Sequence, residues 1–186
     1  MSKIAVLFPG IGYHADKPLL YYSGKLAASM GYEVLKILYP PCEVNLKGAD
    51  SDQINAFVNE CLGAADAILK EVKPSGNDDI LFISKSIGTA IAAAYAGSKE
   101  WNVSHVFFTP LVETFAYVKK GSGIAFNGTK DNWADHNEVC RLCREADIPV
   151  TTIDNANHSL ETGVVTTDTE IICKVMRFVE EYLRSL

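Results

Sequence analysis

The chain has 186 residues, of which 48% are hydrophobic and 22% are charged, and its formal net charge is -6. This length and composition are typical of one soluble domain, residues 1–186, that buries a sizeable core. The acidic balance and the lack of any Lys/Arg-rich run argue against nucleic acid as a partner.

The sequence begins with a short apolar run that lacks a small-residue cleavage site, so we expect a first strand rather than a signal peptide. No apolar run approaches the ~20 residues that span a bilayer, which argues against a membrane partner. The odd number of scattered cysteines predicts reduced thiols and a cytoplasmic location. These cysteines are Cys42, Cys61, Cys140, Cys143 and Cys173.

Cys140 and Cys143 form a C-x-x-C pattern within a charged helical stretch. A redox motif would follow a strand, so structural packing is the favoured interpretation. No second pair of Cys or His residues has the spacing of zinc ligands. We therefore expect neither a metal nor another cofactor.

Apolar runs with the length of strands alternate with helical patterns along the whole chain. Strands are expected at Lys3–Phe8, Glu33–Leu38, Ile80–Ser84, His105–Phe108, Gly123–Asn127 and Val150–Ile153. Helices are expected at Lys17–Met30, Asp52–Val72, Gly88–Ala96, Leu111–Val118, Trp133–Ala146 and Thr169–Leu186, the last capped by Thr167 and Glu170. This alternation predicts the α/β class: a doubly wound, mainly parallel six-stranded sheet with helices on both faces.

Two glycines follow the first expected strand, in Pro9-Gly10-Ile11-Gly12. They fit a simple turn, or a loop whose Ile11 and Gly12 amides bind an oxyanion together with the amide of Ile87. The third glycine of a dinucleotide-binding loop and the Gly-Lys ending of a P-loop are missing. Nucleotide binding is therefore disfavoured. Tyr13 and His14 come next and are candidates to line a substrate pocket, although His14 also fits an exposed loop. Tyr21 and Tyr22 fit the wall of a pocket or the packing of a helix equally well.

The third expected strand runs directly into Ser84-Lys85-Ser86-Ile87-Gly88 and then into small helix-forming residues. This layout predicts a nucleophile elbow that presents the Ser86 hydroxyl, with Ser84 at the first glycine position of G-x-S-x-G. An ordinary strand–turn–helix is the alternative. Lys85 is a pocket candidate that could attract an anionic substrate group, but a solvent-directed side chain is favoured.

Polar residues that could complete a catalytic triad follow later strands. Asp131 comes after the fifth strand, as a triad acid or a helix cap, and His158 lies in the loop after the sixth. The order Ser86, Asp131, His158 is that of α/β-hydrolase triads. Glu113, after the fourth strand, is the alternative acid. The segment from Thr109 to Gly121 has only about a dozen residues, which leaves no room for a large lid. His105 and His136 are expected to be structural.

With these residues the chain resembles the α/β-hydrolase superfamily, in particular its small lidless members of the dienelactone-hydrolase kind. The resemblance covers nearly the whole chain, from the third of the usual eight strands onward. It is carried by Pro9-Gly10-Ile11-Gly12, Ser84-Lys85-Ser86-Ile87-Gly88, Gly128-Thr129-Lys130-Asp131 and Asn157-His158-Ser159-Leu160. Ser84 departs from the family glycine, and Pro9 replaces the histidine that many relatives have.

The resemblance and the residues imply an esterase-like serine hydrolase that acts on a small acyl substrate through an acyl-enzyme. Ser86 would be the nucleophile, His158 the general base and Asp131 its partner. The alternative is a non-catalytic binding or interaction protein of the same fold, and the oligomeric state stays open. We expect Asp131 to raise the pKa of His158 above ~6.5 more than burial lowers it, which puts the activity titration between about pH 6 and 8.

Overall fold

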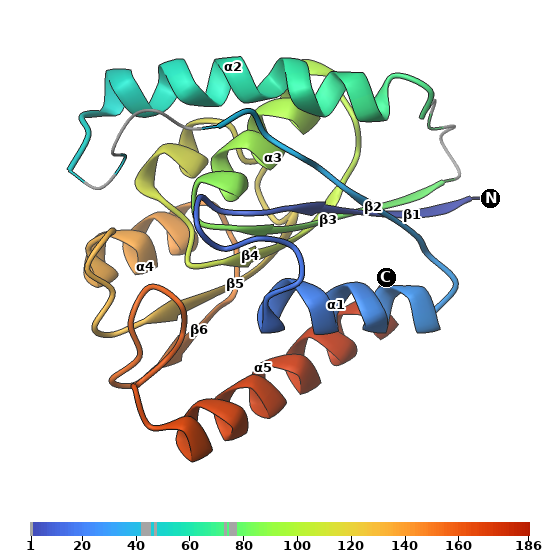
Figure 1. Cartoon of the computed structure of the whole chain (residues 1–186). Coiled ribbons are helices and arrows are strands. Elements are labelled where there is room, and N and C mark those ends of the chain that lie inside the picture. Colours follow the sequence, from blue (N-terminus) through green and yellow to red (C-terminus); the bar gives the residue numbers. More distant parts are fainter. Residues whose placement is uncertain (1, 42–45, 47, 73, 75–77) are drawn as a thin grey trace.

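The computed structural model describes residues 2–41, 46, 48–72, 74 and 78–186 of the chain (Figure 1). Cys42 lies outside these residues. The strands are β1 (Lys3–Phe8), β2 (Glu33–Lys36), β3 (Asp79–Lys85), β4 (Ser104–Phe108), β5 (Gly123–Gly128) and β6 (Val150–Ile153). The helices are α1 (Pro18–Ser29), α2 (Ser51–Leu69), α3 (Ile87–Ser98), α4 (His136–Glu145) and α5 (Val165–Ser185), with a 3-10 helix η1 (Val112–Ala116).

Within the described residues the strands form a six-stranded sheet in the order β2-β1-β3-β4-β5-β6, and each neighbouring pair is parallel. Helices α2, α3 and α4 pack on one face, and α1 and α5 pack on the other (Figure 1). Because helices cover both faces, the central strands are continuous apolar runs, such as Ile80–Ile83 in β3. The predicted α/β class and sheet are confirmed.

The ends of several elements differ from the sequence prediction. Strand β2 stops at Lys36, since Leu38 is 76% exposed and the following Pro40 and Pro41 have no N–H to donate to a neighbouring strand. The segment predicted as a helix from Leu111 to Val118 is the short η1.

The predicted capping box of the last helix is wrong. Helix α5 begins at Val165, so Thr167 lies inside its first turn. The side chain of Asp168 instead accepts hydrogen bonds from the backbone N–H groups of Thr162 and Gly163, at 2.6 and 3.3 Å. A carboxylate within the helix therefore holds the preceding loop.

Helix α4 also begins later than predicted, at His136 rather than Trp133. Its N-cap is Asp135, whose side chain accepts a hydrogen bond from the N–H of Glu138 at 2.9 Å. Residues 129–135 are thus free to form the loop that carries Asp131. No helix in the described part of the chain is long and apolar enough to cross a membrane.

Candidate active site

Ser86 occupies a strained turn between β3 and α3. Its φ of 56° and ψ of -128° are unusual for a residue with a side chain. The Ser86 N–H donates to the carbonyl of Phe108 at 3.0 Å, and the Thr89 hydroxyl donates to the Ser86 carbonyl at 2.6 Å. The ends of β3, β4 and α3 together hold this conformation, a strained strand-to-helix turn of the kind that a nucleophile elbow requires.

Glycine at position 88 lets α3 approach the end of β1. A Cβ atom there would lie 2.3 Å from the Phe8 carbonyl oxygen and 2.4 Å from that of Pro9. Ser84, at the first glycine position of the G-x-S-x-G pattern, is fully buried, and its hydroxyl donates to the Val106 carbonyl at 3.3 Å. The serine is therefore accommodated within the sheet.

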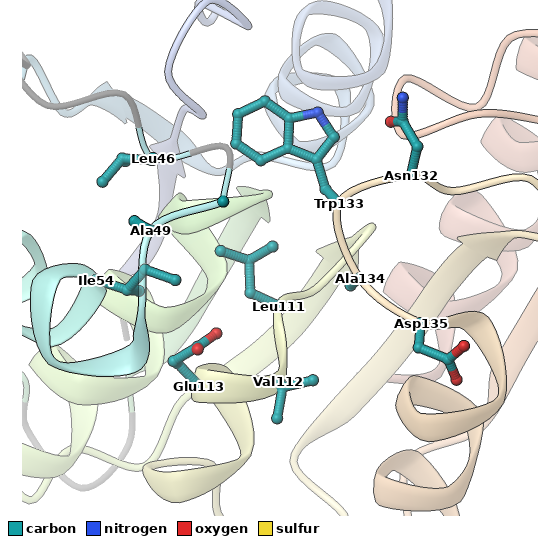
Figure 2. Close-up of a pocket in the computed structure, with 11 residues that line it drawn as sticks. Leu46, Ala49, Ile54, Leu111, Val112, Glu113, Asn132, Trp133, Ala134 and Asp135 are labelled. Atoms are coloured by element: carbon teal, nitrogen blue, oxygen red, sulfur yellow. The ribbon is translucent and has the colours of Figure 1, made fainter.

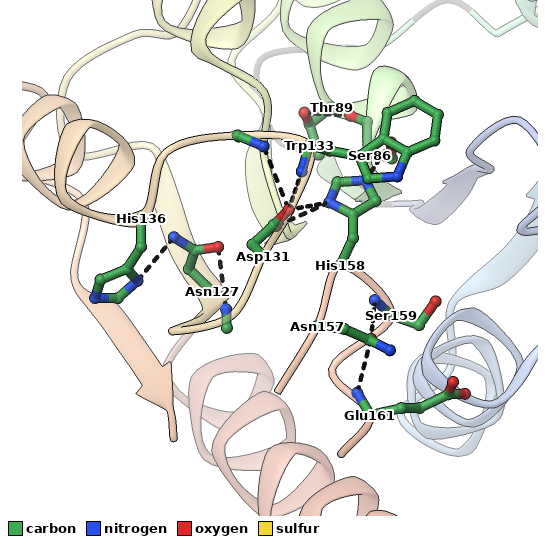
Figure 3. A network of polar contacts seen from close by, with 12 residues as sticks. Ser86, Thr89, Asn127, Asp131, Trp133, His136, Asn157, His158, Ser159 and Glu161 are labelled. Atoms are coloured by element: carbon green, nitrogen blue, oxygen red, sulfur yellow. Dashed lines mark hydrogen bonds and ion pairs between the residues drawn. The ribbon is translucent and has the colours of Figure 1, made fainter. Parts of the chain in front are cut away.

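The side chains of Ser86, His158 and Asp131 form one continuous chain of contacts (Figure 3). His158 Nε2 lies 2.7 Å from Ser86 Oγ. His158 Nδ1 lies 2.8 and 3.0 Å from the two carboxylate oxygens of Asp131. If Nδ1 donates its proton to the carboxylate, Nε2 is left to accept the proton of the serine hydroxyl. The contacts predicted from the sequence among these three residues are confirmed.

The loops after β5 and β6 are joined closely, which brings Asp131 to His158. Gly128 makes this approach possible, because a Cβ there would lie 2.3 Å from the carbonyl oxygen of Ala156. The Lys130 N–H donates to the same carbonyl at 2.9 Å. Backbone contacts between the loops therefore fix the distance between the carboxylate and the imidazole.

Asp131 is both an ion-pair partner and a local cap. Its Oδ1 accepts hydrogen bonds from the backbone N–H groups of Trp133 and Ala134, at 2.8 and 3.3 Å. The alternative acid, Glu113, accepts a hydrogen bond from the Ser51 hydroxyl at 3.0 Å. His158 pairs with Asp131 and not with Glu113 in this structure.

Burial controls the protonation of the histidine. It lowers the pKa of His158 below the usual 6.5, and the nearby Lys85 lowers it further, while Asp131 opposes both. The predicted upward shift is therefore wrong, because the side chain of His158 is only 9% exposed and desolvation outweighs the carboxylate. For Asp131, burial raises the pKa, but the hydrogen bonds and charge of its partners prevail and hold it below the usual value.

The three amides predicted to bind an oxyanion lie at two adjoining turns. Ile11 and Gly12 form the tip of a turn closed by mutual hydrogen bonds between the Gly10 and Tyr13 backbones, both 3.1 Å. Gly12 has a φ of +73°, which suits glycine. Ile87 is the first residue of α3, where a helical N–H has no acceptor within the helix. Oxyanion binding by these amides stays a prediction.

A cavity of about 260 Å³ opens beside Ser86 and His158. Its walls include two of the predicted pocket residues, Tyr13 and Lys85. The third, His14, is exposed and is not part of the wall, and neither are Tyr21 and Tyr22.

The predicted solvent-directed position of Lys85 is wrong. The residue is only 3% exposed, and its Nζ lies 5.1 Å from the centroid of the Tyr13 ring. Burial lowers the pKa of Lys85 to about 7, although Asp131 opposes the shift. The sequence does not predict the burial of Lys85, because this burial depends on how the loop after β1 folds over the end of β3.

Trp133, which the sequence predicts only as the start of a helix, contacts His158. Its ring stacks on the His158 imidazole with centroids 5.1 Å apart and an interplanar angle of 13° (Figure 3). Trp133 and Asn132 also border a second cavity of about 590 Å³, which Leu111 and Glu113 line from the segment after β4 (Figure 2). The two cavities therefore adjoin at the tryptophan.

The remaining residues considered from the sequence lie away from this cavity. Cys143 is buried in the core, and desolvation raises its pKa to about 12, which fits the predicted packing role. His105 is buried with its pKa lowered by desolvation to about 3, and His136 Nδ1 lies 3.2 Å from Asn127 Nδ2. No group of three or more potential metal ligands is found among the described residues.

Comparison with protein-family models and with curated proteins gives no match. Solved structures do match. An alpha-beta serine hydrolase homologue from Coxiella burnetii has a TM-score of 0.60 at 15% identity, covering 93% of this chain and 84% of that one. A serine hydrolase without a lid from Xanthomonas campestris has a TM-score of 0.64 at 12% identity, covering 95% and 82%.

A third match is Est1E from Butyrivibrio proteoclasticus with bound ferulic acid. Its TM-score is 0.69 at 10% identity, and the likeness covers 100% of this chain and 89% of that one. At such low identities the likeness establishes the fold alone. The protein therefore has the α/β-hydrolase fold, and its structural neighbours include a lidless serine hydrolase.

Proposed function

We propose that the protein is a serine hydrolase of the carboxylesterase type. The observation that carries this proposal is the continuous contact from Ser86 Oγ through His158 to Asp131, at 2.7 and 2.8 Å, at the carboxyl ends of the strands. These distances meet the requirement for proton transfer from a nucleophile to a general base. The contact lies beside an open cavity, where a substrate has access to the serine.

In the proposed reaction, Ser86 Oγ attacks the acyl carbon while His158 Nε2 takes the hydroxyl proton. The ester bond breaks, the alcohol leaves with the proton from His158, and the acyl group stays on Ser86. Water then attacks the acyl-enzyme and loses a proton to His158; the bond between the acyl carbon and Ser86 Oγ breaks, His158 returns the proton to Oγ, and the acid is released. Asp131 holds the imidazole in the required tautomer and stabilises the imidazolium.

We assign the oxyanion hole to the amides of Ile11, Gly12 and Ile87. The turn geometry at Ile11 and Gly12 and the position of Ile87 at the start of α3 support this assignment. One well-placed donor of this kind stabilises the transition state by about 2.7–4 kcal/mol.

The proposed substrate is a small acyl compound. The cavity measures about 260 Å³, and the segment 109–121 between β4 and β5 contains only the short η1 instead of a lid. A small aromatic acid bound to Est1E, a protein of the same fold, supports small-molecule binding here. We further propose that residues 1–186 form one catalytic domain and, from the reduced thiols that the sequence predicts, that it acts in the cytoplasm.

Hydrolysis of a short-chain 4-nitrophenyl ester tests the proposal. We expect the protein to cleave the ester and Ser86→Ala to remove nearly all turnover, while circular dichroism and the unfolding midpoint stay those of the native fold. Ser84→Ala, which removes a hydroxyl two residues away, is the matched control and should keep its turnover. Unchanged hydrolysis in Ser86→Ala, or no hydrolysis by the unmodified protein, would overturn the proposal; the second result favours a binding protein of this fold.

A further inference from the structure

A lysine with a largely buried side chain lines the cavity directly beside the proposed nucleophile. Lys85 immediately precedes Ser86 in the chain and is only 3% exposed, yet its side chain forms part of the cavity wall. Burying a cation is costly unless a partner compensates for the lost hydration. A largely buried cation that faces the cavity is therefore suited to a negatively charged partner bound there.

The carboxylates nearby leave Lys85 without a direct partner. Among the described residues no hydrogen bond or ion pair is found for its ammonium, only the contact with the Tyr13 ring. Asp131 influences Lys85 through charge, but its oxygens are already bound to His158 and to two backbone N–H groups. Glu161 also acts on Lys85 through charge, but it is exposed.

A second cation lies on the same side of the cavity. Lys17 Nζ is 5.2 Å from the centroid of the Tyr13 ring, and Lys17 lines the cavity together with Lys85. The ring between them is held in place, because the Tyr13 hydroxyl accepts a hydrogen bond from the Leu19 N–H at 3.2 Å. Two ammonium groups and a fixed aromatic ring thus form one wall, while the Ser86–His158 pair forms another.

We propose that Lys85, assisted by Lys17, binds a negatively charged group of the substrate, so that the preferred substrate is an acyl ester that also carries a carboxylate. A bound carboxylate would supply the partner that Lys85 lacks, and a salt bridge of this kind would orient the acyl carbon toward Ser86. The inference rests on the proposed hydrolase function and adds the charge of its substrate.

A pair of matched esters tests the inference: 4-nitrophenyl hydrogen glutarate, whose far end is a carboxylate, and its methyl ester, whose far end is neutral. We expect kcat/KM for the anionic ester to exceed that for the neutral ester by about tenfold or more at pH ~6.5, as expected for a charge-assisted hydrogen bond. Taking the ratio cancels changes that affect both esters equally, including the protonation of His158.

The preference should fall as pH rises through about 7, where Lys85 loses its proton. The groups that face this ammonium are Tyr13 and Lys17 from the loop after β1, Asp131 from the loop after β5, and His158 and Glu161 from the loop after β6. Among these, Asp131 is ionised well below this range because its partners lower its pKa, and a change in the charge of His158 affects both esters equally. A preference that does not change with pH would contradict the assignment to Lys85.

Substitution separates recognition from a general effect. Lys85→Met should reduce the ratio of the two kcat/KM values by about tenfold and make it independent of pH, and Lys17→Met should reduce it by a smaller factor. Lys70→Met, at the exposed C-cap of α2, is the control and should leave the ratio unchanged. An equal loss for both esters in Lys85→Met would overturn the inference.

A binding measurement tests the anion subsite separately from the proposed hydrolase function. It also gives a result if Lys85→Met does not fold. Calorimetry should detect glutarate binding to the unmodified protein at pH ~6.5, and weaker binding to Lys17→Met. Hydrolysis of the neutral ester without any preference for the anionic one, and without glutarate binding, would refute the anion subsite and leave the hydrolase standing. Glutarate binding without hydrolysis of either ester would refute the hydrolase and leave the subsite standing.

Discussion

His158 receives opposing influences on its pKa from its neighbours. Burial and the positive charge of Lys85 favour the neutral imidazole, whereas the Asp131 carboxylate favours the imidazolium, and the net shift is downward. A general base must be neutral at the start of the reaction. The surroundings of His158 therefore extend its range as a base toward lower pH.

The pH dependence of hydrolysis should report this shift. For a neutral 4-nitrophenyl ester, kcat/KM reports the free enzyme, so it should rise as His158 loses its proton, with a midpoint below 6.5, and be nearly level at neutral pH. The sign follows because a lowered pKa keeps the active, unprotonated form populated at lower pH. A midpoint above 7 would mean that the carboxylate outweighs burial.

Replacing Asp131 by Asn should depress kcat severely, by about 10⁴-fold, because the imidazole loses the partner that fixes its tautomer and stabilises its charge. Glu113→Gln is the matched control, since Glu113 contacts Ser51 rather than the histidine. Steady-state kinetics of both variants on one ester makes the comparison. Full activity in Asp131→Asn together with loss of activity in Glu113→Gln would reverse the assignment of the acid.

The junction between β3 and α3 depends on close packing against the end of β1. Gly88→Ala places a methyl group where the Phe8 carbonyl oxygen is only 2.3 Å away, so we expect a destabilisation of about 1–3 kcal/mol. Gly63→Ala, in α2, is the control: its methyl group meets no atom within 4 Å, and alanine should stabilise the helix by about 0.5–1 kcal/mol.

Urea unfolding of these two glycine variants measures the difference. Gly88→Ala should also lower the rate of ester hydrolysis, because α3 can make room for the methyl group only by shifting the elbow that carries Ser86. Equal changes in the free energy of unfolding for the two variants would show that the close approach of α3 to β1 does not limit the stability of the fold.

The type and order of these elements follow from local sequence, and their ends follow less well. Apolar runs gave all six strand positions within the described residues, because strands covered on both faces carry a strong hydrophobic signal. The start of α5 was misplaced because the polar side chains near Thr167 resemble a helix cap, whereas the helix begins at Val165 without a side-chain cap and Asp168 binds the loop before it. The start of α4 was misplaced for a similar reason, since Asp131 and Asp135 both accept backbone hydrogen bonds.

Across the whole molecule, parallel strands bring residues distant in sequence to one edge of the sheet. Ser86, Asp131 and His158 each follow the carboxyl end of a different strand, so their proximity could be predicted from the topology and their order. Their catalytic roles remain predictions. The positions of the Lys85 and Trp133 side chains could not be predicted, because each depends on packing against a loop from another part of the chain.

The most direct test of the central claim, that Ser86 is an activated nucleophile, is labelling with a fluorophosphonate probe followed by mass spectrometry of the modified peptide. Such a probe reacts with a serine whose hydroxyl is activated by a neighbouring base. We predict one adduct, on Ser86, that forms in the unmodified protein and is abolished by His158→Ala. Labelling of a different residue, or no labelling of the folded protein, would contradict the account.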